Sequence, residues 1–184
     1  MALALLVTGL WSFSEAILWF IVADVPVSYV AVRHGWRAAS VAAIVAALCA
    51  VPGGALLHLW TSADPQRVHD LLVALPAIDA AMIERTSHAY VEGGYAEMLR
   101  GSFGGTPYKL YAAAAGASSP PDAWLAPFLL ASFLVRVPRF LIVGLSVALV
   151  NRALSGWLSA GQRLAVLGAC WAVFYAWYFV TMPS

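Results

Sequence analysis

The stretch SEAILWFIVADVP, residues 14–26, places two carboxylates in the middle of a long apolar run. Glu15 and Asp24 are the only acidic or basic side chains between Met1 and Val32. An ionised carboxylate in hydrocarbon is strongly unfavourable unless a cation pairs with it or a proton neutralises it. We therefore expect both carboxylates to face partners inside the protein.

The composition is typical of a membrane protein. Of the 184 residues, 62% are hydrophobic and 10% are charged, whereas soluble domains are about half apolar and about a quarter charged. A formal net charge of +1 provides no basic surface for a nucleic acid. The N-terminus lacks the positive region of a signal peptide and its apolar run is long, so we expect it to be retained.

Three apolar segments are predicted to be membrane-crossing helices. Residues 38–57 and 164–182 are uncharged and have about the 20 residues that a crossing needs. Residues 123–150 are also long enough, but Arg136 and Arg139 lie near their middle. Arginine at this depth is tolerated where it faces protein, water or an anion, so these two side chains indicate a buried site.

Two further apolar segments do not fit an ordinary crossing. Residues 1–32 are too long for one crossing and too short for two crossings with a turn. Residues 95–119 are interrupted by Gly104, Gly105 and Pro107, which break helices. Both segments are predicted to be re-entrant hairpins, whose irregular backbone must line a cavity or pack against protein.

Together these elements predict an all-α integral membrane protein with a single membrane domain, residues 1–184. Its expected parts are a first repeat, an amphipathic connector, a second repeat and a C-terminal transmembrane helix. They span residues 1–60, 61–92, 93–150 and 158–182, respectively. Each repeat is a re-entrant hairpin followed by a crossing, and the two are expected to be inverted, a common plan of secondary transporters. In the connector, Asp64 is expected to cap a helix that Pro76 interrupts.

A charge pattern links the two predicted repeats. An offset of 85 residues carries three charged positions of the first repeat onto positions of opposite sign. The pairs are Glu15 with Arg100, Asp24 with Lys109, and Arg37 with Asp122. In this plan the loops 33–37 and 151–163 share one side and hold four basic residues, against two on the connector side. The positive-inside rule makes the first side cytoplasmic and the C-terminus external.

The charged residues of these segments predict one binding site. Its expected members are the substrate-binding residues Arg136, Arg139, Lys109 and Arg100 and the proton-coupling or gating residues Glu15 and Asp24. Four cations against two acids leave positive charge that suits a phosphate head group, which arginine binds bidentately. The acids then carry protons or hold the arginines when no ligand is bound. A static salt-bridge core that only stabilises the fold is the alternative.

Other chemistry has little support in the sequence. His58, His69 and His88 lack a Cys/His cluster at ligand spacing and are expected to be interfacial or solvated, so no metal or other cofactor is predicted. No GxSxG elbow, Walker loop, HExxH motif or dinucleotide fingerprint occurs. We therefore expect that the chain is not an enzyme. The two tyrosines that flank Lys109 are expected mainly to pack.

Several motifs resemble the DedA/VTT (SNARE-associated) membrane family, and within it the short YqaA-like branch. EAILWFIVAD, residues 15–24, carries the two acids nine residues apart, with valine and alanine where the family has prolines. AVPGGALL, residues 50–57, loosely matches a glycine-containing turn of the family. GGTPYKLYAAAAG, residues 104–116, is similar to the second motif of the branch, and VRVPRF, residues 135–140, to a later arginine-containing span. The resemblance covers most of residues 10–150.

The resemblance implies a multi-pass lipid transporter, flippase or scramblase of the bacterial inner (cytoplasmic) membrane. The implied substrate is a phospholipid or the polyprenyl phosphate called undecaprenyl phosphate. The resemblance also implies that the proton-motive force can drive transport. Membrane lipid is thus the expected partner and nucleic acid is not, while a homo-oligomer is compatible with the sequence. A small ion or solute carrier is a further alternative.

Overall fold

The computed structural model describes residues 1–118 and 125–181, and these residues form helices and no strand. The seven helices of the described residues are α1 (Ala2–Ile17), α2 (Asp24–Ala63), α3 (Pro65–Val73), α4 (Ala80–Gly104), α5 (Tyr108–Ser118), α6 (Leu125–Leu154) and α7 (Ala160–Thr181). Of these, α2, α6 and α7 are long and apolar enough to cross a membrane. The predictions of an all-α fold and of three crossing-length apolar helices are confirmed.

The first helix pair comes from the N-terminal apolar run. α1 ends at Ile17, and α2 begins at Asp24 after a six-residue turn. α2 is interrupted at Gly35, whose φ of 79° lies in the left-handed region that glycine adopts readily. Residues 24–34 therefore form a separate short helix that pairs with α1, and residues 36–63 form the long helix that follows.

The second helix pair consists of residues 95–104 of α4 together with α5, and here the glycine break precedes the pair. α4 is interrupted at Gly94, with φ 54°, and ends at Gly104. Gly105 follows in the left-handed conformation (φ 85°) typical of a helix C-terminus, and Pro107 precedes α5. The predicted break at Gly104, Gly105 and Pro107 is therefore confirmed as a break between two helices.

The long helix of residues 36–63 forms the centre of the packing. Its buried face consists of small residues, Ala39, Ala42, Ala43, Ala46, Ala47 and Ala50, which allow neighbouring helices to approach closely. Beyond them, Gly53 lies against the Phe13 carbonyl of α1, and Gly54 lies against the ring of Tyr108 in α5. A side chain at either glycine would overlap these neighbours, which explains the PGG sequence in an otherwise continuous helix.

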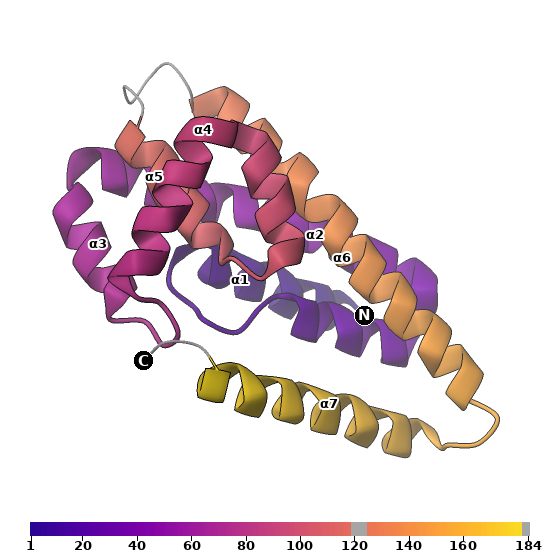
Figure 1. Ribbon diagram of the computed structural model, residues 1–184. Coiled ribbons are helices and arrows are strands. Elements are labelled where there is room, and N and C mark those ends of the chain that lie inside the picture. Colours follow the sequence, from indigo (N-terminus) through magenta and orange to yellow (C-terminus); the bar gives the residue numbers. More distant parts are fainter. Residues whose placement is uncertain (119–124, 182–184) are drawn as a thin grey trace.

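The two ends of the molecule carry different loops. The α6–α7 loop lies next to the Gly35 break, where Asn151 Nδ2 donates a hydrogen bond to the Val32 carbonyl (3.4 Å). α3 and the start of α4 lie at the opposite end (Figure 1). The loops 33–37 and 151–163 are thus neighbours, as the sequence-based plan requires. Asp122, which that plan pairs with Arg37, lies outside the described residues.

The connector follows its sequence signals. Asp64 caps α3 by accepting a hydrogen bond from the backbone N–H of Arg67 (3.1 Å). The helix stops at Val73, and the chain turns around Pro76 before Asp79 caps α4. The predicted cap and interruption are both confirmed.

Candidate functional site

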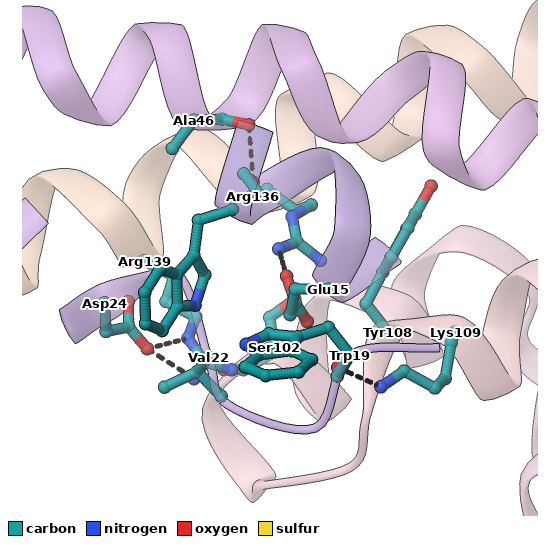
Figure 2. Close-up of polar contacts among 12 residues, drawn as sticks. Glu15, Trp19, Val22, Asp24, Ala46, Ser102, Tyr108, Lys109, Arg136 and Arg139 are labelled. Atoms are coloured by element: carbon teal, nitrogen blue, oxygen red, sulfur yellow. Dashed lines mark hydrogen bonds and ion pairs between the residues drawn. The ribbon is translucent and has the colours of Figure 1, made fainter. Parts of the chain in front are cut away.

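The two arginines of α6 meet the two carboxylates of the first helix pair. Arg136 Nη2 donates to Glu15 Oε2 in the last turn of α1. Arg139 donates from Nη2 and Nε to Asp24 Oδ2 at the start of α2, at 2.6 and 3.1 Å. Figure 2 shows the two ion pairs on neighbouring sides of the α1–α2 turn. Arg136 and Arg139 are three residues apart and so lie on one face of α6, as expected from the sequence. This spacing lets α6 pair with both ends of the α1–α2 turn.

The second helix pair joins the same cluster through backbone groups. Arg139 Nη1 donates to the carbonyl of Ser102 in the last turn of α4 (2.9 Å). Lys109 Nζ, at the start of α5, donates to the carbonyl of Trp19 in the α1–α2 turn (2.7 Å). The turns of the two helix pairs therefore meet at the arginine face of α6, and Arg139 contacts both pairs.

The cluster is shielded from solvent. Glu15, Asp24, Lys109 and Arg136 are between 3% and 6% exposed. The guanidinium of Arg136 lies between two aromatic rings, 4.5 Å from the centroid of Tyr108 and 4.9 Å from that of Phe140. Cation–π contacts of this kind strengthen when water is excluded. Arg136 is therefore held by both its carboxylate and its aromatic neighbours.

The backbone of the α1–α2 turn is satisfied by side chains from several helices. Trp11 Nε1 of α1 donates to the Ile21 carbonyl (2.9 Å), and the N–H of Val22 donates to Tyr175 Oη of α7 (2.8 Å). The bond from Lys109 adds a third contact. Irregular backbone away from water needs such partners because each unpaired polar group is costly.

A cavity of about 100 Å³ lies at this meeting point. The charged side chains in its wall are Glu15, Lys109, Arg136 and Arg139. Much of the remaining wall is aromatic and comes from the α1–α2 turn, the second pair, α6 and α7: Phe20, Tyr108, Tyr111, Phe140, Phe174, Tyr175 and Tyr178. The space is small, charged on one side and apolar on the other, and it can hold an anionic group attached to an apolar body.

Positive charge exceeds negative charge in this cluster. Arg136 and Arg139 each have a carboxylate partner, whereas Lys109 forms no ion pair with any described residue. The buried donor Nε of Arg136 also has no hydrogen-bond partner within residues 1–118 and 125–181. The site therefore has the charge and the unused polar capacity to bind an anion.

Arg100 does not belong to the cluster, and its expected place beside Lys109 is wrong. Its side chain is 74% exposed and pairs with Glu97, three residues earlier on α4. The buried face of this part of α4 carries Met98 and Gly101, so Arg100 points outward. Gly101 packs against the Tyr111 ring, and this contact fixes the rotation of α4. In that rotation the adjacent Arg100 points away from the cavity.

His58 also differs from the expectation of an interfacial side chain. It is fully buried and its ring lies 5.1 Å from that of Phe128. Both ring nitrogens lack a hydrogen-bond partner among the described residues. No group of three His, Cys, Asp or Glu side chains that could hold a metal ion occurs in the described part of the chain.

Several site groups could not be found from the sequence. The Trp19 and Ser102 carbonyls are backbone atoms, which no residue pattern reveals. Tyr108 stood out only as a neighbour of Lys109, but it also donates to Ser132 Oγ (2.8 Å) and covers Arg136. Tyr175 is one of many aromatic residues in α7, and nothing in its spacing indicates a hydrogen bond to the distant Val22.

Comparisons of the chain with protein-family models, with curated proteins and with solved structures find no match. The function is therefore argued from the site itself.

Proposed function

We propose that the protein is a multi-pass transporter of the DedA/VTT type that moves a phosphate-bearing lipid, a phospholipid or a polyprenyl phosphate, across the bacterial inner membrane. The observation that supports this proposal is the cavity whose wall carries three cations, Lys109, Arg136 and Arg139, and one carboxylate, Glu15. An excess of positive charge in a poorly hydrated site is unfavourable without an anion, so this wall favours anion binding.

Phosphate is the anion that suits this wall best. Guanidinium groups bind phosphate with two parallel hydrogen bonds, and an ammonium group adds a compact charge. A phosphate first binds at Lys109, and during transport it competes with Glu15 and Asp24 for Arg136 and Arg139. A released carboxylate then takes up a proton, and this exchange couples lipid movement to the proton gradient. Arg100 has no part in this mechanism.

The membrane arrangement belongs to the same proposal. The two helix pairs are re-entrant hairpins that enter from opposite sides, and each is followed by a crossing, so the halves form an inverted repeat. Support comes from the helix breaks at Gly35 and Gly94 and from the side-chain partners of the α1–α2 turn. Such turns are tolerated at depth where their backbone groups are satisfied within the protein.

A static salt-bridge core is the second candidate function. It is favoured by one observation, that each arginine of α6 already has a carboxylate partner. Buried ion pairs of this kind can act only to fix helix positions. In that case the charged cavity binds nothing and the protein serves as a structural or interaction component of the membrane.

Reconstitution in liposomes separates the two candidates. Purified protein is tested with fluorescent phospholipids and with a labelled polyprenyl phosphate, and transbilayer movement is compared with that in empty vesicles. Lys109→Gln removes the unpaired cation, and Arg100→Gln removes an exposed cation of the same helix pair. We expect movement with the wild-type protein and with Arg100→Gln, and loss of movement with Lys109→Gln. A folded wild-type protein that moves neither lipid class would refute transport.

A further inference from the structure

The charged side chains of the site sum to a single positive charge. Within the described residues the cluster holds the carboxylates of Glu15 and Asp24 and the cations of Lys109, Arg136 and Arg139. Two negative charges balance two of the three positive ones. Of these five side chains, Glu15, Lys109, Arg136 and Arg139 line the cavity and Asp24 lies behind Arg139; the further titratable groups of the described residues in its wall are Tyr108, Tyr111, Tyr175 and Tyr178.

The position of the surplus charge is also defined. Arg136 is committed to Glu15 and packed between two rings, and Arg139 is committed to Asp24 and the Ser102 carbonyl. Among the described residues, Lys109 donates to the Trp19 carbonyl alone, which carries no full charge. A ligand anion therefore finds its uncompensated counter-charge at Lys109, without breaking an ion pair.

Charge balance matters in a small cavity that has many aromatic residues in its wall. Electrostatic interactions strengthen as water is excluded, and a charge left unpaired in such a site is strongly unfavourable. A ligand with one negative charge neutralises the cluster. A ligand with two negative charges leaves an excess beside the carboxylates of Glu15 and Asp24. The site thus discriminates by the number of charges on the ligand.

We propose that the cavity selects a singly charged phosphodiester over a doubly charged phosphomonoester. This inference rests on the proposed binding of a phosphate group and names its class. A phosphodiester has one negative charge across the physiological range, whereas a phosphomonoester gains its second charge with a pKa of about 6. The diester can be a phospholipid head group or a water-soluble diester, and both have the chemistry that Lys109 recognises.

Two soluble probes that differ by one charge test the selectivity. Binding of dibutyl phosphate and of monobutyl phosphate to the purified full chain in detergent is measured by calorimetry at about pH 5 and about pH 8. We expect the diester to bind at least about tenfold more tightly than the monoester at the higher pH. At the lower pH the monoester is mostly singly charged, so the difference should shrink. The diester keeps one charge at both pH values. Any change in its affinity between them therefore reports titration of the protein's own groups and serves as the control.

Charge variants make the test independent of probe shape. Glu15→Gln and Asp24→Asn each raise the cluster to two positive charges, so each should improve binding of the monoester relative to the diester. Lys109→Gln should weaken both probes, and Lys109→Arg should keep the wild-type preference. Glu15→Gln and Asp24→Asn make the same charge change at separate ion pairs. If one of them fails to fold, the other still provides the test. Thermal unfolding identifies the folded variants.

The outcomes separate this inference from the transport proposal. Equal or tighter binding of the monoester at about pH 8 would overturn charge selectivity and leave phosphate binding intact. Binding of neither probe, together with no lipid movement in vesicles, would overturn both proposals. Preferred binding of the soluble diester without movement of phosphatidylglycerol in vesicles would support the selectivity, assign it to a water-soluble ligand and contradict lipid transport.

Discussion

At the scale of single residues, the site depends on two ion pairs, and one of them, Arg136 with Glu15, buries both partners. Arg136 and Glu15 are almost fully shielded, so removal of one leaves the other charged and unpaired. Removing one partner of a buried pair is far more damaging than replacing both. The pair can therefore be tested as a unit.

A double-mutant cycle on this pair is the first prediction. Arg136→Gln alone and Glu15→Gln alone should each lower the free energy of unfolding by roughly 3–5 kcal/mol. The double variant should recover most of that loss, because no unpaired charge remains. Chemical unfolding in detergent measures all three. Additive losses in the double variant would show that the two side chains do not stabilise one another.

Arg139 should not be replaceable by lysine. It makes three hydrogen bonds, two to Asp24 and one to the Ser102 carbonyl, from a planar group. Lysine keeps the charge but lacks the fork geometry. We expect Arg139→Lys to lower the melting temperature and the rate of lipid movement, whereas Arg100→Lys, at an exposed position, should change neither. Wild-type values in Arg139→Lys would show that charge alone is sufficient.

At the scale of elements, close helix packing depends on Gly53 and Gly54. A side chain at Gly53 would meet the Phe13 carbonyl and Ala16 of α1, which are fixed by the helix backbone. Overpacking of this kind typically costs about 1–3 kcal/mol. Gly53→Val should therefore destabilise the protein, while Gly168→Ala in α7, with nothing near its added carbon, should be neutral or slightly stabilising. Melting temperatures in detergent compare the two. Equal tolerance of both changes would contradict the close packing of α1 and α2.

α7 is attached to the remainder of the protein by few contacts. None of its residues is buried, but Tyr175 accepts a hydrogen bond from the N–H of Val22 (2.8 Å), and three of its aromatic rings line the cavity. This helix therefore covers the cavity while lying mostly outside the core. Figure 1 shows α7 alongside the other helices at the edge of the molecule.

Loss of the Tyr175 hydroxyl should loosen this helix. Tyr175→Phe leaves the N–H of Val22 without its acceptor, which should destabilise the protein by about 1–3 kcal/mol. Tyr178→Phe is the matched control, since the Tyr178 ring lines the same cavity but its hydroxyl makes no hydrogen bond with a described residue. Unfolding measurements compare the two variants. The same effect in both would rule out a specific role for the hydrogen bond.

At the scale of the whole molecule, the arrangement of the ends predicts which loops share a side of the membrane. Single cysteines at His34, Ser155 and Gln66 are introduced into a chain whose Cys49 and Cys170 are replaced by serine. In intact cells, a membrane-impermeant maleimide should label Gln66→Cys and leave the other two unlabelled. In inside-out vesicles the pattern should be reversed. Labelling of His34→Cys on the same side as Gln66→Cys would contradict a membrane crossing by residues 36–63.

Much of the fold could be predicted from local features of the sequence. Long apolar runs predicted the helices later seen as α2, α6 and α7, and Gly104, Gly105 and Pro107 predicted the break before α5. Asp64 predicted the start of α3. These signals are local because helix length, helix breaking and capping depend on a few consecutive residues.

The sequence also determined that the charges at depth must meet. Buried carboxylates and cations cannot stay unpaired, so Glu15 and Asp24 were expected to meet basic groups of the second predicted hairpin and of the arginine-containing span. Which acid pairs with which arginine was not determined. That choice depends on how α6 is turned and shifted against the first helix pair.

Only the tertiary structure decided the membership of the site. It excluded Arg100, because the close approach of Gly101 to Tyr111 sets the rotation of α4 and turns Arg100 outward. It added the Trp19 and Ser102 carbonyls and the Tyr175 hydroxyl, which come from segments far apart in the chain. By itself, the sequence determined which groups needed partners, since burial of a charge depends on the residue and its apolar neighbours. The partners themselves were decided by helix packing, which depends on contacts between distant segments.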